Sequence, residues 1–343
     1  MDDEEIGYMS ERLPQVRFSV NSRCGRACFF CRQSGESLST QASAAMSLDD
    51  IFILGTAFKA VGLTSIKLTG GDPALWDPLV DAVRILKKTL GMKPVEVISR
   101  HPSIGNRAEA LSSVDTDVLN ISLDTLRPEC HKGITGRDDH SEILSAIDCC
   151  VQAGLDVKLN MVVMRDVNVH EVMDIVRYSE RTGVRTLKLL DVIQDLDDDD
   201  ESFVGRISET ARLADLYTPL HIISDMLAKY VGNDGELALQ GGLGHPMRKF
   251  QLPSGLCVLV KDHKAGAWYG SICQSCPSFP CHDALMALRV TADLRLQYCL
   301  LREDVAIDLR PLFQDAEALN TALRNAISVF SEATFMENRE VTL

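Results

Sequence analysis

Short β-rich runs and longer amphipathic stretches alternate between residues 15 and 190, and this alternation restricts the possible folds more than any other feature. The runs expected to form strands are 16–20, 65–70, 95–99, 118–124, 157–163 and 186–192. Helical periodicity lies between them, as in 48–62 and in 142–154, which ends at Gly154. Regular strand–helix alternation implies an α/β fold with parallel strands and right-handed crossovers. A partial barrel and a doubly wound sheet both fit, and both place their chemistry at the carboxyl ends of the strands.

The charge balance excludes some classes of partner. The chain has 49 Asp and Glu against 35 Lys and Arg, for a formal net charge of −14. A nucleic-acid partner is therefore not expected, although a local basic pocket for one small anion is compatible with this balance. No window approaches about 20 uncharged apolar residues, so no membrane partner is expected. The acidic N-terminus lacks the apolar segment of a signal peptide, and we expect a cytoplasmic protein.

Eleven cysteines are present, and seven of them fall in two clusters, at 24–31 and 273–299. In the segment NSRCGRACFFCRQ, Cys24, Cys28 and Cys31 follow the first expected strand. Three close thiolates with no nearby fourth are a poor structural zinc site but suit three irons of a cubane cluster. The fourth iron would then be open to an exogenous ligand.

These cysteines, with Phe30 before the last of them, resemble the signature of the radical S-adenosylmethionine (SAM) superfamily. The segment TGGDP is similar to that superfamily's glycine-rich SAM-binding motif. The resemblance implies a partial (β/α)6 TIM-like barrel, a [4Fe-4S] cluster on the three cysteines, and reductive cleavage of SAM to a 5′-deoxyadenosyl radical. It also implies SAM-contacting positions at Phe30, Gly70, Gly71, Asp72, Pro73, Ser99, Ser122 and Asn160.

Three longer stretches, NISLDTLRPECHKGITGRDD, VKLNMVVMRDVNVHEVMDIVRYSERTGV and LRVTADLRLQYCLL, resemble more narrowly the family of GTP cyclases of molybdopterin biosynthesis. This resemblance implies a barrel core over 1–230 and a C-terminal domain over 231–343 that carries an auxiliary iron–sulfur cluster. Its expected ligands are Cys273, Cys276, Cys281 and Cys299, of which Cys281 lies in an inserted segment, PSFPCHDA. Two alternatives stay open: Cys281 is free or labile, or the four thiolates bind zinc.

The nucleotide pocket departs from the family pattern. Arg289 stands where the family has one of two arginines, but Ala287 takes the place of the other, and the C-terminus NREVTL lacks the cyclases' Gly-Gly tail. Basic residues remain at other strand positions where the relatives bind substrate. The expected substrate-binding residues are Arg17, Lys67, Lys158, Lys188 and Arg289, since Lys and Arg are natural partners of phosphate.

The favoured interpretation is a specialised paralogue that abstracts hydrogen from an anionic nucleotide, nucleoside or nucleotide-sugar, as in nucleoside-antibiotic biosynthesis. An external one-electron reductant of the flavodoxin or ferredoxin type is the expected partner. Three alternatives stay open: a GTP 3′,8-cyclase, a peptide-modifying radical SAM enzyme, and a non-catalytic metal-binding module. We further expect His101 and His131 in loops near the site.

Overall fold

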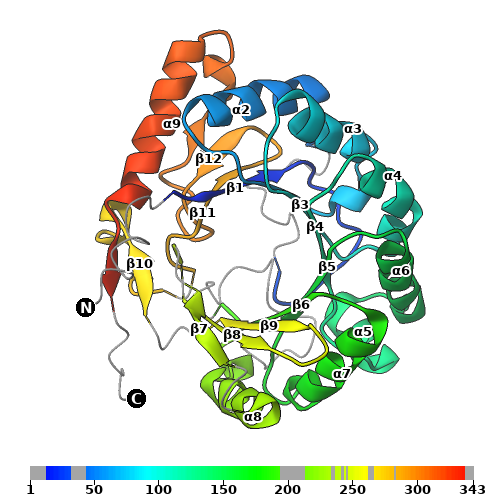
Figure 1. Ribbon diagram of the computed structural model, residues 1–343. Helices are drawn as coiled ribbons and strands as arrows, with labels where there is room; N and C mark the ends of the chain where they lie inside the picture. Colours follow the sequence, from blue (N-terminus) through cyan, green and yellow to red (C-terminus); the bar gives the residue numbers. More distant parts are fainter. Residues whose placement is uncertain are drawn as a thin grey trace.

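Six parallel strands form the centre of the computed structural model, which describes residues 13–31, 44–193, 213–232, 236–240, 243–244, 246–261, 266–281 and 283–336. Their order in the sheet follows their order in the sequence, and the sheet curves into a partial barrel (Figure 1). The strands are β1 (Gln15–Ser19), β2 (Ile66–Thr69), β3 (Val95–Ser99), β4 (Val118–Ser122), β5 (Val157–Val162) and β6 (Thr186–Leu190).

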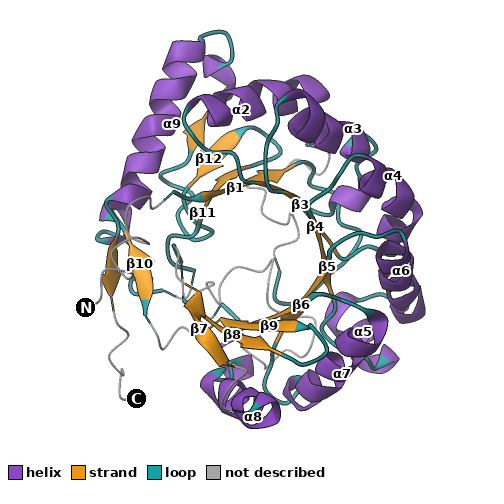
Figure 2. Cartoon of the chain, viewed as in Figure 1, coloured by secondary structure: helices purple, strands orange, loops and turns teal. Residues whose placement is uncertain are grey.

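Helices connect these strands and cover the outer face of the curved sheet (Figure 2). In α2, Ser47 and Asp50 form a capping box at the N-terminus, and Ile51, Leu54 and Phe58 recur at helical spacing and are buried. The helices of this layer are α2 (Leu48–Ala60), α3 (Leu79–Arg84), α4 (Ala108–Ser113), α5 (Pro128–Thr135), α6 (His140–Gln152) and α7 (Val172–Thr182).

The C-terminal third of the chain extends the sheet at both edges. β11 (Ala287–Val290) pairs in parallel with β1, and β9 (Cys257–Lys261) pairs in parallel with β6. The described strands form a twelve-stranded sheet and a separate two-stranded pair. The remaining elements are α8 (His221–Val231), β7 (Glu236–Gln240), β8 (Met247–Gln251), β10 (Ala267–Tyr269), β12 (Arg295–Gln297), β13 (Ile307–Asp308), α9 (Ala316–Ser331) and β14 (Thr334–Met336).

The two faces of the parallel strands differ in burial. Along β5 and β6, fully buried apolar residues alternate with half-buried ones, as the two-residue period of a strand requires. The fully buried set includes Leu187 on β6 and, on other strands, Phe18 on β1 and Leu68 on β2. These side chains pack under the helices, where burial of each contributes about 1.5–3 kcal/mol to the stability of the fold. The half-buried set, including Lys158 and Lys188, therefore faces the interior of the barrel.

The predicted α/β fold with a partial (β/α)6 barrel is confirmed. Sequential strand order excludes the doubly wound alternative, in which the order reverses at a switch point. The domain boundary at residue 230 stays a prediction, and the acidic run 195–201 lies outside the described residues. Within the described ranges, no helix is both long and apolar enough to cross a membrane.

Candidate active site

The first cysteine cluster lies in the loop that follows β1, at the carboxyl end of the barrel strands. The pKa of Cys24 is raised to about 11, mainly by burial and then by the neighbouring Asp72 and Cys28. Burial also raises the pKa of Cys28, against the effect of Arg100, whose charge likewise interacts with Cys31. Thiols of this kind stay protonated until a metal ion displaces the proton, which is the usual coupling of metal binding to ligand ionisation.

The donor set fits the predicted cluster, because thiolates are the preferred ligands of iron–sulfur centres. The three thiols interact electrostatically with one another or with the same arginine, so the loop brings them to one region. Among the described residues, no three His, Cys, Asp or Glu side chains already surround one metal-sized position. The ligand assignment therefore rests on residue type and on this proximity.

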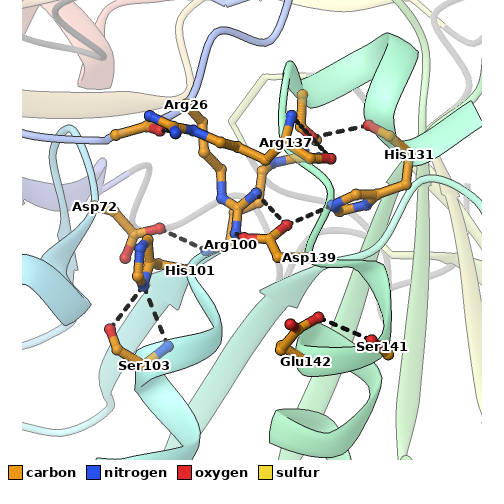
Figure 3. Close-up of polar contacts among 12 residues, drawn as sticks. Arg26, Asp72, Arg100, His101, Ser103, His131, Arg137, Asp139, Ser141 and Glu142 are labelled. Atoms are coloured by element: carbon orange, nitrogen blue, oxygen red, sulfur yellow. Dashed lines mark hydrogen bonds and ion pairs between the residues drawn. The ribbon is translucent and has the colours of Figure 1, made fainter. Parts of the chain in front are cut away.

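The loop is fastened to the barrel by the turn between α5 and α6 (Figure 3). Arg26, whose side chain is 1% exposed, donates two hydrogen bonds to the Asp139 carboxylate at 2.7 and 3.0 Å. His131 contacts the same carboxylate at 2.9 Å. His131 lies inside α5 and is buried, so its predicted place in a loop is wrong, whereas His101 does follow β3 as a loop residue.

The TGGD motif packs directly against the chain that leads into the cysteines. A Cβ on Gly70 would lie 2.5 Å from the Asn21 carbonyl oxygen, and a Cβ on Gly71 would lie 2.4 Å from backbone atoms of Arg23. Their contact with SAM stays a prediction, whereas the close neighbour that the structure shows is the chain itself. Only glycine fits here.

Asp72 is 2% exposed, and protein donors surround its carboxylate. The Ser99 hydroxyl and the Arg100 backbone N–H each donate to it at 2.7 Å, and the Ala74 backbone N–H donates at 3.0 Å. Pro73 begins the short helix that follows. Asp72 and Ser99 thus connect the ends of β2 and β3 rather than presenting free polar groups.

Ser122 and Asn160, the other predicted SAM contacts, are neighbours across β4 and β5, and Asn160 is in register with Lys188 on β6. All three are half-buried and face the barrel interior, which is the placement that the prediction requires. Phe30 lies beside Phe29, with 5.4 Å between the ring centroids.

Four of the five predicted substrate-binding residues meet inside the barrel. Arg17 is in register with Lys67, which forms a 2.8 Å ion pair with Glu96. The pKa of Lys67 is lowered to about 8, mainly by burial and also by Lys158 and Arg17, against the opposing effect of Glu96. Lys188 has a pKa well below its ordinary value, because of burial first and then the charges of Lys67, Lys158, Arg17 and Lys261.

Arg289 has a different environment. Its side chain is 1% exposed and lies 3.4 Å from the Asp283 carboxylate, which also accepts a 2.7 Å hydrogen bond from the Leu300 backbone N–H. This pair lies next to Cys299, since both charges influence the pKa of that thiol. Ala287 is buried in β11. The substrate-binding role of Arg289 stays a prediction.

The four C-terminal cysteines line one narrow cavity of about 10 Å³. Burial raises the pKa of Cys299 to about 11 and also raises that of Cys273. The Tyr269 hydroxyl donates a 2.8 Å hydrogen bond to the Cys281 carbonyl oxygen and thereby holds the inserted segment at the cavity. The residues around the cavity are Ile272, Cys273, Cys276, Phe279, Cys281, Ala284, Cys299, Leu301 and Arg302.

Sequence reasoning missed several charged residues of the site. Arg100 directly follows Ser99, and Asp124 lies two residues beyond Ser122, so both could have been found as polar residues just past strand ends. Glu96 and Lys261 lie within β3 and β9, and only the pairing of strands reveals that they face the cations.

Comparison with known proteins agrees with this geometry. Residues 18–179 match the model of the Radical SAM superfamily. These residues form a radical SAM domain, and this domain identifies the chain as an enzyme; proteins of the superfamily use SAM and a [4Fe-4S] cluster.

Beyond this domain, the similarity extends over nearly the whole chain. A probable GTP 3′,8-cyclase of Methanothermobacter marburgensis is 28% identical over 324 residues, which cover 92% of this chain and 94% of that protein. A GTP 3′,8-cyclase of Limosilactobacillus fermentum is 26% identical over 329 residues, or 92% of this chain and 88% of that protein.

Solved structures share the fold at low sequence identity. Streptococcus suis SuiB has a TM-score of 0.59 at 12% identity, over 96% of this chain and 74% of that one. The structure of anSMEcpe with bound AdoMet has a TM-score of 0.53 at 13% identity, over 84% and 76% of the two chains. At these identities the likeness concerns the fold alone.

Proposed function

We propose that this radical SAM enzyme abstracts a hydrogen atom from an anionic purine nucleotide bound inside the barrel, with GTP as the first candidate. The observation that carries the proposal is the group of five interior cations, Arg17, Lys67, Lys158, Lys188 and Lys261, whose charges help to lower the pKa values of Lys67 and Lys188. Two of the five pair with carboxylates in the structure, Lys67 with Glu96 at 2.8 Å and Lys261 with Asp191 at 3.3 Å. A polyphosphate would compensate the positive charge of such a group.

The relatives are named for GTP cyclisation, which favours the cyclase alternative and gives no support to a nucleoside-antibiotic substrate. A nucleotide other than GTP is the second candidate. It is favoured by Ala287, which replaces one of the family's two arginines, and by Arg289, which is already engaged by Asp283.

In this proposal Cys24, Cys28 and Cys31 hold the initiating cluster, and Ser122 and Asn160 orient SAM from the barrel interior. When bound, the cluster and SAM supply the radical that removes hydrogen from the substrate. The lysines and Arg17 fix the phosphates, so that one C–H bond is presented to the reactive carbon. The enclosing sheet excludes water and competing hydrogen donors. An external one-electron reductant serves the reaction.

Cys273, Cys276, Cys281 and Cys299 are the proposed ligands of the auxiliary cluster. Four thiolates leave no iron open, so the purine would be recognised by side chains. Electron spin-echo spectroscopy with ¹⁵N-labelled GTP tests this directly. We expect no nitrogen coupling to the auxiliary cluster in the natural protein, and a clear coupling would show that an iron binds the base.

The function is tested by anaerobic incubation of the reconstituted enzyme with SAM, dithionite and GTP. We expect 5′-deoxyadenosine and a product cyclised between C3′ and C8, both of which disappear in Cys28→Ala. ATP, CTP and UTP are run in parallel. Product from one of these and none from GTP would move the assignment to the second candidate, and SAM cleavage in Cys28→Ala would contradict the cluster assignment.

A further inference from the structure

Arg100 places a fixed positive charge beside the cysteine loop. Its guanidinium carbon lies 5.4 Å from the centroid of the Phe30 ring, and Phe30 stands between Cys28 and Cys31 in the chain. The guanidinium is ion-paired with Asp124, and the two side chains are 14% and 2% exposed. A cation over an aromatic face and beside a buried carboxylate is attracted by both.

Both members of this pair are held by the backbone. The Arg100 N–H donates to the Asp72 carboxylate at 2.7 Å (Figure 3), and Asp124 accepts a 2.9 Å hydrogen bond from the Val162 N–H. Arg100 thus follows β3, while its counter-ion lies beyond β4 and contacts β5. Because both charges are anchored in a largely dry site, they act on their neighbours with little screening.

The positive end of the pair is the one directed at the cysteine loop. The guanidinium lies over Phe30, which stands between Cys28 and Cys31, whereas the Asp124 carboxylate accepts from the Val162 N–H on β5. Within the part of the chain that the structure describes, the guanidinium is hydrogen-bonded to Asp124, so the pair presents a fixed dipole to whatever the three thiols hold.

We propose that Arg100 is the positioning residue that sets the reduction potential of the initiating cluster, by stabilising the negative charge that the cluster gains on reduction. The inference rests on the assignment of the three cysteines as ligands, and it is independent of the nucleotide. One electron from an external reductant converts the 2+ core to the 1+ core, and no proton or bond changes place. With three thiolates the net charge passes from −1 to −2, so a fixed cation favours the reduced state and Asp124 opposes it.

Three variants separate this role from a structural one. Arg100→Met removes the cation and keeps an apolar stem over Phe30, and it should lower the potential. Arg100→Lys keeps the charge and should stay near the natural value. Asp124→Asn removes the opposing charge while its amide oxygen can still accept from the Val162 N–H, and it should raise the potential.

The test is a redox titration of the reconstituted holoenzyme without nucleotide, followed by EPR. The signal of the initiating cluster is identified by its change when SAM is added. At the natural midpoint, the ratio of reduced to oxidised cluster should fall about tenfold in Arg100→Met, which equals about 59 mV for a one-electron couple. In Asp124→Asn the ratio should rise, and in Arg100→Lys it should stay within about threefold.

The proposal is overturned if iron-loaded Arg100→Met keeps the natural ratio, or if both charge removals shift the potential in the same direction. Loss of SAM affinity at an unchanged potential would also overturn it, since Arg100 would then be a SAM ligand only. If Arg100→Met does not retain iron, Asp124→Asn decides, because a potential that does not rise in that variant contradicts the mechanism. A failure to turn over GTP leaves these measurements unaffected.

Discussion

Replacing Gly71 by alanine should destabilise the cysteine loop more than the addition of one methyl group suggests. The new Cβ would meet the carbonyl carbon and oxygen of Arg23 at 2.4 Å, and neither can move without shifting the chain before Cys24. That shift would break two short backbone hydrogen bonds, from the Gly71 N–H to Asn21 and from the Asp72 N–H to Arg23, both 2.7 Å. At about 1 kcal/mol per bond and about 1–3 kcal/mol for overpacking, the expected loss is about 3–5 kcal/mol.

For a chain of 343 residues this loss corresponds to a fall of about 4–7 °C in the melting temperature. Calorimetry of the metal-free protein measures it, and iron analysis of the reconstituted protein should show fewer irons in the variant. Gly133→Ala is the matched control, because it lies in α5 with no atom within 4 Å of the new Cβ and should be neutral or slightly stabilising. If Gly71→Ala melts within about 1 °C of the natural protein and binds full iron, the close-packing argument is wrong.

Three further outcomes are expected. Since the pKa of Lys67 is lowered to about 8, its side chain is charged below that pH, and affinity for an anionic nucleotide should fall by at most about tenfold per pH unit as the pH rises through 8. Titration calorimetry at pH 7 and 9 checks this, and Lys67→Met should flatten the pH dependence of the affinity. Asp139→Asn removes the counter-charge of buried Arg26 and should cost about 3 kcal/mol by thermal unfolding, whereas exposed Asp138→Asn should change little. Cys281→Ala should weaken retention of the auxiliary iron under chelator challenge while SAM cleavage persists; equal retention would exclude Cys281 as a ligand.

The sequence was sufficient for the parallel strands because their apolar runs are bounded by turn residues and separated by helical periodicity. All six predicted strands exist, with ends shifted by at most two residues. The interior lysines were also predictable in kind, since Lys158 and Lys188 interrupt apolar runs at strand positions.

The residues that each site residue contacts in the folded protein were not predictable from the sequence. The contact of Gly71 with the chain at Arg23, the enclosure of Asp72 by Ser99 and Arg100, and the burial of His131 in a helix all depend on segments far apart in the sequence. The position of the Arg100 charge beside the cysteine loop is apparent only from the tertiary structure, which places Asp124 and Phe30 around it. Local pattern determines which residues can join a site, whereas tertiary packing determines what each one contacts.

The pairing of β1 with β11 has a consequence for biosynthesis. The strand that leads into the first cysteine loop has β2 on one side, but its other edge is completed by residues 287–290, some 270 positions later. A nascent chain on the ribosome therefore carries an open strand edge beside its N-terminal thiols for most of translation. Iron delivered before the last strands emerge would encounter a barrel that still lacks β11 beside β1. This topology therefore favours insertion of the cluster into the completed chain.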